Sequence, residues 1–193
     1  MLMAARSPWV VLACLGTSLS LNVYLAATRQ HVTITRLSEI PNPYPKGRLM
    51  PVLRATRFGE GVATIEWAAD SRPTLLYIFT PACAWCARNV AGIRTIAAER
   101  GKEFRVIGIS LSETGLADYV RANNFVFPVY TNAAEPDGRK LTVSATPETL
   151  LISREGRVEN SWIGAYGGNI KTQIESALAV HLPEIPQLDV PRK

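Results

Sequence analysis

Short apolar runs alternate with segments of helical periodicity between residues 58 and 182. The run TLLYIF (74–79) is apolar throughout, which is typical of a central strand buried on both faces of a sheet. FRVIGIS (104–110) has the same character, VATIEW (62–67) alternates apolar and polar positions, and FPVY (127–130) fits a short strand. This part of the chain is therefore predicted to contain a sheet with at least one central, fully buried strand.

Helices and a hairpin are predicted between and after these strands. Apolar positions recur every three to four residues over 83–100, and a second helix-like pattern covers 114–123. ETLLIS (148–153) and RVENSWIG (157–164), joined by the turn REG, predict a hairpin, and a last helix follows over 168–182. The order β-β-α-β-α-β-β-α predicts an α/β fold whose sheet has helices on both faces.

The N-terminal segment 7–27 contains no charged residue over 21 positions. A helix needs about 20 mostly apolar residues to cross a bilayer, so this segment predicts a transmembrane anchor or uncleaved signal. A cleaved signal peptide is the alternative. Arg29, Arg36, Lys46 and Arg48 follow the segment, and the positive-inside rule alone favours a cytoplasmic position for the remainder of the chain.

Proline-rich polar stretches flank the compact part. Residues 28–57 include IPNPYPKGRLMP and are expected to form an extended tether. The tail 183–193, PEIPQLDVPRK, has the same character and is expected to be flexible. The folded domain is therefore expected over 58–182.

Composition argues against several classes of protein. The net charge is +5, but no run of five or more like charges forms the basic stripe that nucleic-acid binding requires. Three cysteines are too few for a disulfide-scaffolded secreted protein. The two histidines, His31 and His181, provide little material for a histidine-rich metal centre or a Ser-His-Asp triad.

Two of the three cysteines form the motif CAWC directly after the buried strand 74–79. Cys83 would lie at the N-terminus of the following helix, where unpaired N–H groups and the helix dipole favour a thiolate. A thiolate is the nucleophile of disulfide exchange. Cys86 follows by almost one helical turn and could attack a mixed disulfide formed at Cys83. The motif therefore indicates redox chemistry.

Other interpretations of the motif are weaker. A zinc site usually has a second cysteine pair or suitably spaced histidines, and neither is present. A purely structural disulfide across two residues closes a very small loop and constrains little. A second informative stretch is SATPETLLIS, in which Pro147 opens a strand. Base rates alone favour a trans peptide bond at that proline.

The order strand–CxxC–helix, followed by Ala145-Thr146-Pro147 before a hairpin, resembles the thioredoxin superfamily. The chain looks most like the membrane-anchored TlpA/ResA type of thiol–disulfide oxidoreductase. The resemblance covers roughly 60–180 and rests on YIFTPACAWC, FRVIGIS, FPVY, ATPETLLI and REGRV. It implies a thioredoxin-like fold, with a central mixed β-sheet flanked by helices, behind a single N-terminal transmembrane helix.

The resemblance also implies roles for particular residues. Cys83 would be the nucleophile and Cys86 the resolving thiol, with Pro147 in the cis form beside them. The backbone of Thr146 would pair with the bound substrate as an added strand, and Trp85 would contact the substrate as well. The redox-active disulfide would need no further cofactor and no metal, and no G-x-G-x-x-G motif for NADPH or flavin occurs in the sequence.

Partners and location follow from the same resemblance. The substrates would be protein dithiols and disulfides of exported proteins, with apocytochrome c or metal-centre assembly proteins as the usual clients. An electron donor of thioredoxin-relay type in the membrane would supply reducing equivalents. The resemblance places the protein in the cytoplasmic (inner) membrane as a single-pass protein, with its catalytic domain periplasmic or otherwise extracytoplasmic, against the charge count.

The sequence departs from the family at several positions. Ala82 stands where the family usually has Trp, Asn89 where many ResA-type members have Glu, and Ala91 where many have Pro. Tyr77 occupies the position of the buried acid of thioredoxin. No carboxylate that would accept a proton from Cys86 is therefore evident from the sequence.

Two other functions compete with this interpretation. Thr80 and Cys83 match the T-x-x-C half of a peroxiredoxin motif, although the expected proline is absent, and a thiol peroxidase would need an arginine such as Arg139 or Arg154 beside the thiolate. The other is a non-catalytic adaptor or copper carrier. Copper carriers on this fold tend to use C-x-x-x-C with a distal histidine, whereas the spacing here is shorter and His181 lies at the end of the last predicted helix, far from the pair.

Overall fold

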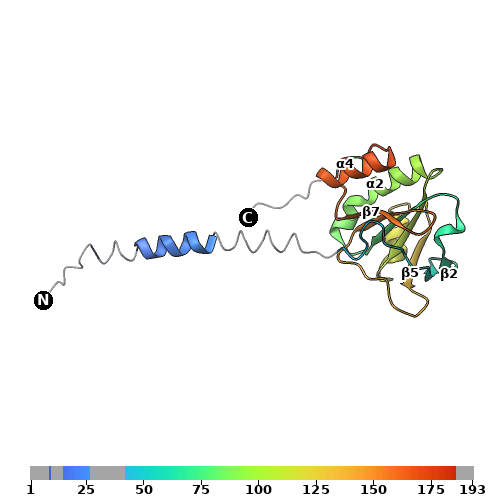
Figure 1. The fold of residues 1–193 in the computed structure, drawn as a ribbon, viewed down its shortest axis with the longest axis horizontal. Helices are drawn as coiled ribbons and strands as arrows, with labels where there is room; N and C mark the ends of the chain where they lie inside the picture. Colours follow the sequence, from blue (N-terminus) through green and yellow to red (C-terminus); the bar gives the residue numbers. More distant parts are fainter. Residues whose placement is uncertain (1–8, 10–14, 27–41, 186–193) are drawn as a thin grey trace. The chain divides into compact units, whose positions relative to one another are not determined.

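The structure is a computed structural model that describes residue 9 and residues 15–26 and 42–185 (Figure 1). The chain divides into two units, 1–41 and 42–193. In the first unit residues 15–26 are helical, and Asn22 Nδ2 donates to the carbonyl of Ser18 at 2.8 Å. No helix of the described residues has both the length and the apolar character needed to cross a bilayer. The expected span 7–27 lies partly outside the described residues.

The second unit contains a seven-stranded mixed sheet in the order β2-β1-β5-β4-β3-β6-β7. Strands β3, β4 and β5 are parallel neighbours, and all other neighbouring pairs are antiparallel. All six residues of β3 are buried, as its continuous apolar run predicts. The strands are β1 (Leu53–Arg57), β2 (Gly61–Ile65), β3 (Thr74–Phe79), β4 (Arg105–Ser110), β5 (Val129–Ala134), β6 (Glu148–Ile152) and β7 (Val158–Ile163).

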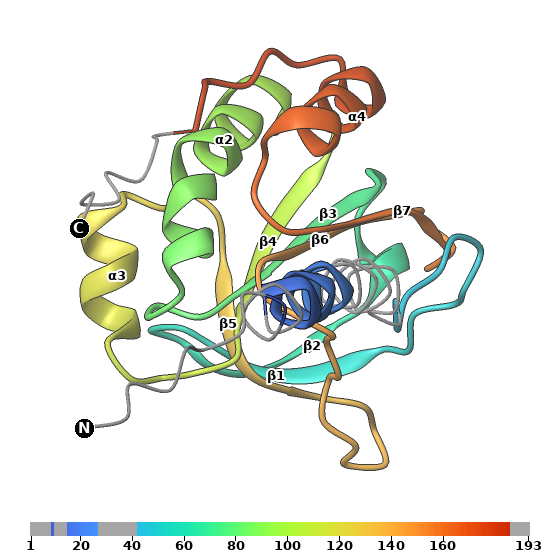
Figure 2. The same ribbon diagram turned by 90° about the vertical axis from the view of Figure 1, so that its left-hand side faces the viewer.

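The helices α2 (Ala84–Arg100), α3 (Leu116–Ala122) and α4 (Gly168–Leu178) pack on one face of this sheet (Figure 2). Their buried residues form one core cluster with Tyr77 and Phe79 of β3. The expectation of helices on both faces is therefore wrong for the described residues. The steps from β3 to β4 and from β4 to β5 run in the same direction across the sheet, so right-handed crossovers place α2 and α3 on the same side.

The opposite face of the sheet carries a second core cluster, built on Leu76 and Ile78 of β3. It is covered by Tyr44 and Met50, which precede β1, and by Trp67 in the short 3-10 helix η1 (Trp67–Ala69). Partly buried residues of the β5–β6 connection pack against the same cluster, and Figure 2 shows this connection on the side of the sheet away from α2.

The compact unit begins earlier than the sequence suggested. Residues 53–57, expected to belong to the tether, form β1 within the sheet. Segment 47–50 pairs with the start of β7: the Gly47 N–H donates to the Val158 carbonyl at 2.7 Å, and the Met50 N–H donates to the Gly156 carbonyl at 2.8 Å. The folded domain therefore includes the chain from Asn42 onward rather than from 58.

Candidate active site

The cysteine pair lies where β3 gives way to α2, at the carboxyl edge of the parallel strands. Cys83 is the N-cap residue of α2, with extended backbone angles (φ −81°, ψ 112°). Its Sγ accepts a hydrogen bond from the Cys86 N–H at 3.1 Å. This is the arrangement that the spacing predicts, because N-terminal N–H groups of a helix lack intrahelical acceptors and can stabilise an anionic sulfur.

The two thiols are in the free form and occupy different environments. Cys83 is partly exposed, whereas Cys86 is fully buried. Burial alone would raise the pKa of Cys83, but hydrogen bonding with Cys86 and Thr146 outweighs it, so that the pKa is lowered. Burial, together with the neighbouring Cys83, raises the pKa of Cys86 to about 12. Cys83 is therefore the thiol that ionises first.

The loop before β6 completes the site. The Thr146–Pro147 peptide bond is cis in the structure, although base rates alone favoured trans. The Cys83 thiol lies 3.5 Å from the Thr146 carbonyl oxygen, which brings together residues 63 positions apart in sequence. The Pro147 carbonyl accepts from the Gly164 N–H at 2.8 Å. The residue that follows β7 therefore holds this loop in place. Thr146 is partly exposed and Pro147 is buried.

Trp85 lies beside the thiols on the solvent side. Its side chain is 52% exposed, and the guanidinium carbon of Arg88 lies 4.6 Å from the centre of its ring. Such a cation–π contact is a modest attraction that favours one orientation of the indole ring. An apolar surface next to a partly exposed thiol is suited to contact a polypeptide.

The buried side of Cys86 is lined by tyrosines and an amide rather than by a carboxylate. The Tyr77 hydroxyl donates to the Cys86 carbonyl at 3.1 Å, and the Tyr77 ring lies edge-on to that of Tyr166. Asn89 is fully buried; its Nδ2 donates to the Gly164 carbonyl, and its Oδ1 accepts from the Tyr166 N–H. Asn89 thus ties α2 to the loop after β7.

One polar group near the site was not singled out from the sequence. Glu148, the residue after Pro147, is 0% exposed, and its Oε2 has no hydrogen-bond partner among the described residues. The Ser161 hydroxyl donates a long hydrogen bond of 3.4 Å to its Oε1. Burial raises the pKa of Glu148 to about 7. Glu148 pairs with Ile78 across the sheet, so its side chain lies on the face opposite α2.

Three residues considered for other functions lie away from the thiols. Arg139 is bound to Glu135 and Asp137 in the β5–β6 connection. Arg154 belongs to the turn between β6 and β7, at the far end of those strands from Pro147. His181 follows α4 and is exposed. The structure brings none of them to the cysteine pair.

Comparisons with known proteins agree with this architecture. No protein-family model matches the chain. A thioredoxin-like protein of Haemophilus influenzae is 23% identical over 94 residues, which is 47% of this chain and 54% of that protein. The chain thus spans about half the length of the curated relative it matches.

Several solved structures share this fold. A thiol:disulfide interchange protein DsbE of Chlorobium tepidum has a TM-score of 0.55 and 21% identity, covering 70% of this chain and 97% of that one. StoA of Bacillus subtilis has a TM-score of 0.51 and 16% identity, covering 67% and 99%. A thio-disulfide isomerase of Thermus thermophilus has a TM-score of 0.52 and 19% identity, covering 72% and 99%.

The fold is thioredoxin-like. At these identities the comparisons establish the architecture alone. The thioredoxin-like domain carries a CxxC pair at the start of α2 and a cis-proline loop against the first cysteine.

Proposed function

We propose that this protein is a thiol–disulfide oxidoreductase that reduces disulfides of exported proteins through Cys83 and Cys86. One observation carries the proposal. Cys83, with a lowered pKa, is partly exposed at the N-terminus of α2 and lies against the Thr146 backbone, while Cys86 is buried one turn behind it. This pairs an accessible nucleophile with a protected second thiol, as two-step disulfide exchange requires.

The exchange then proceeds in two balanced steps. The Cys83 thiolate attacks one sulfur of the client disulfide and expels the other client sulfur as a thiolate, forming a mixed disulfide. Cys86 loses its proton and attacks the Cys83 sulfur, which releases the second client thiolate and forms the Cys83–Cys86 disulfide. Two electrons pass from the dithiol to the client. A protein dithiol of thioredoxin-relay type in the membrane would return them.

The backbone of Thr146 and the exposed face of Trp85 provide the contact surface for the client in this proposal. The Thr146 carbonyl lies at the sulfur, so an extended client segment that pairs there presents its own cysteine to Cys83. Pro147, the next residue, has no N–H to donate to the client segment. No cofactor beyond the dithiol enters the mechanism.

The reduction potential of the Cys83–Cys86 couple tests this function. The full chain would be equilibrated with dithiothreitol or glutathione buffers, and the free thiols would be trapped by alkylation. We expect a value near or below about −270 mV, as for a reductant. A value near about −120 mV would identify a disulfide-introducing oxidant instead. Failure of the two thiols to form a mutual disulfide would contradict both and favour a peroxidase or an adaptor.

We further propose that segment 7–27 anchors the protein in the cytoplasmic membrane with the thioredoxin-like domain outside the cytoplasm, where cytochrome c biogenesis and related client reduction take place. The uncharged run of 21 residues supports this location. In intact cells we expect a membrane-impermeant maleimide that crosses only the outer envelope to label Cys83, with Cys83→Ser as the control. Labelling only after the cytoplasmic membrane is broken would overturn the proposed location.

A further inference from the structure

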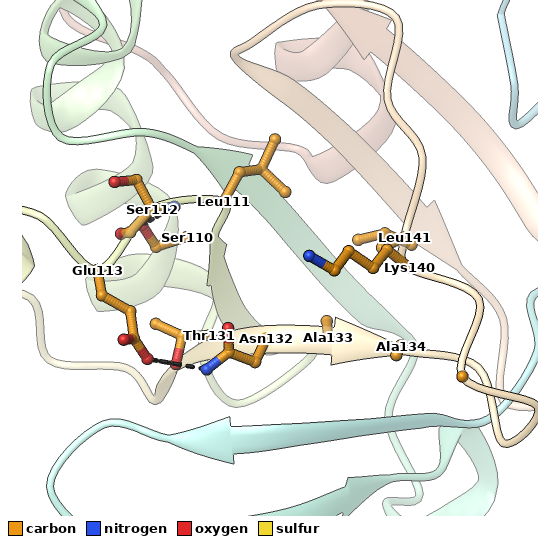
Figure 3. A pocket seen from close by; sticks show the side chains of 11 residues that line it. Ser110, Leu111, Ser112, Glu113, Thr131, Asn132, Ala133, Ala134, Lys140 and Leu141 are labelled. Atoms are coloured by element: carbon orange, nitrogen blue, oxygen red, sulfur yellow. Dashed lines mark hydrogen bonds between the residues drawn. The ribbon is translucent and has the colours of Figure 1, made fainter.

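A hollow of about 320 Å³ opens at the carboxyl edge of the parallel strands β4 and β5. Its walls come from the end of β4, from β5 and from the β5–β6 connection (Figure 3). The lining is mixed, since apolar side chains stand beside hydroxyl, amide and charged groups. Its lining includes Leu111, Glu113, Thr131, Asn132, Lys140 and Leu141.

The hollow lies within reach of the catalytic turn. The Leu111 N–H donates to the carbonyl of Phe79, the last residue of β3, at 2.9 Å. The chain then continues from Phe79 to Cys83 within one turn. Neighbouring strands are about 4.8 Å apart, so a point one or two strands across from the end of β3 lies about 5–10 Å away. An extended polypeptide covers that distance in two or three residues at about 3.3 Å each.

Two charged side chains, Glu113 and Lys140, line the hollow. Glu113 keeps its negative charge, and its Oε1 accepts from the Thr131 hydroxyl at 3.1 Å and from Asn132 Nδ2 at 2.8 Å, which holds it at the side of the hollow away from Lys140 (Figure 3). Lys140 extends from the β5–β6 connection toward Leu111 (Figure 3). Its ammonium group makes no ion pair with any residue that the structure describes.

Lys140 differs in this respect from its neighbour in sequence. Arg139 is held by Glu135 at 2.7 Å and by Asp137 at 3.1 Å, so the acidic side chains of the connection are already occupied. The exposed Lys140 side chain therefore shares the hollow with the apolar side chains of Leu111 and Leu141 and can accept an anionic group from outside. A carboxylate on a short apolar stem matches both features.

We propose that this hollow is a client subsite that holds an aspartate or glutamate side chain two or three residues from the client's reactive cysteine. The inference rests on the proposed function and names its substrate class: extended segments with an acidic residue near the cysteine. Lys140 pairs with the carboxylate, and Leu111 and Leu141 contact the side-chain stem and the neighbouring client residue. Lys140 is thus a specificity-determining residue outside the CxxC motif.

Short peptides whose central cysteine carries a neutral 2-hydroxyethyl disulfide would test this subsite. Aspartate or asparagine is placed two, three or four positions before or after the cysteine, and kcat/KM is measured with the full chain at low ionic strength. We expect aspartate to be favoured about threefold at two or three positions from the cysteine on one side, as for a partly exposed ion pair. The preference should fall as salt is added.

Charge reversal at Lys140 provides the decisive comparison. In Lys140→Glu the aspartate-to-asparagine ratio should drop below one at the favoured position. The matched control is Lys102→Glu, because Lys102 is exposed at the amino edge of β4, the opposite edge from the cysteines. This control should keep the wild-type ratio.

The outcomes separate the subsite from the chemistry. Equal rates for all peptides in the wild type, or the same ratio in wild type and Lys140→Glu, overturn the subsite and leave the oxidoreductase function standing. If the wild type reduces neither the aspartate nor the asparagine peptides, the proposed function itself fails and this inference fails with it.

Discussion

Replacing Cys83 with serine is expected to reduce disulfide reduction to background, a loss of at least about three orders of magnitude, as for removal of a catalytic nucleophile. A serine hydroxyl is not ionised near neutral pH, and the hydrogen bond from the Cys86 N–H cannot change that. The measurement is steady-state reduction of a small protein disulfide with dithiothreitol as the final donor. Cys14→Ser, which lies outside the CxxC motif, is the control and should retain activity.

Replacing Cys86 with serine should have a different signature. Cys83 remains nucleophilic, but no second thiol can release the client, so a mixed disulfide should accumulate. Non-reducing electrophoresis after an acid quench would detect this covalent complex, and Cys83→Ser should not form it. If Cys86→Ser turned over at the wild-type rate, the two-thiol mechanism would be wrong, and a single-cysteine reaction such as peroxide reduction would replace it.

Replacing Glu148 with glutamine is expected to remove a loss of about 2–3 kcal/mol in the free energy of unfolding that the wild type shows between pH 5 and pH 8. In the folded protein burial raises the pKa of Glu148 from its ordinary 4.5 to about 7. Between these values the folded state holds a proton that the unfolded state has lost. Wild-type stability should therefore decrease as the pH rises from about 4.5 to 7 and then level off.

Urea denaturation at pH 5 and pH 8 would measure this effect. The variant should lose most of the wild-type pH dependence, because the buried amide cannot ionise. Glu159→Gln on the neighbouring strand β7 is the matched control, since Glu159 is exposed, and it should behave like the wild type at both pH values. If the wild type were equally stable at pH 5 and pH 8, the pKa of Glu148 would not be raised in the folded protein.

The strand and the helix start that hold Cys83 could be predicted because their sequence patterns lie within a few neighbouring residues. An uninterrupted apolar run identified β3, and the position of Cys83 between that run and a helical pattern placed it at a helix N-terminus. β1 escaped detection because LRATR has two arginines and follows a proline-rich stretch. Its burial depends on pairing with both β2 and β5, which a local pattern does not reveal.

Features that depend on contacts between residues far apart in sequence became evident only in the structure. The contact of Cys83 with Thr146 joins residues 63 positions apart, and only the resemblance, not the residues themselves, indicated a cis bond at Pro147. Glu148 opens a strand that is buried on both faces, so alternation gave no indication that its carboxyl group points into an apolar layer. Asn89 looked like the loss of a family carboxylate, whereas in the structure it bridges α2 to the loop after β7.

The pairing of segment 47–50 with the start of β7 affects whether copies of the domain can associate through this edge of the sheet. An uncovered edge strand offers free N–H and C=O groups to any other strand, which invites aggregation. Here the protein's own chain occupies those groups at the start of β7, through Gly47 and Met50. A recombinant fragment cut at the start of β1 would uncover this edge and also remove Tyr44 from the core. Soluble fragments of this protein should therefore begin at or before Asn42.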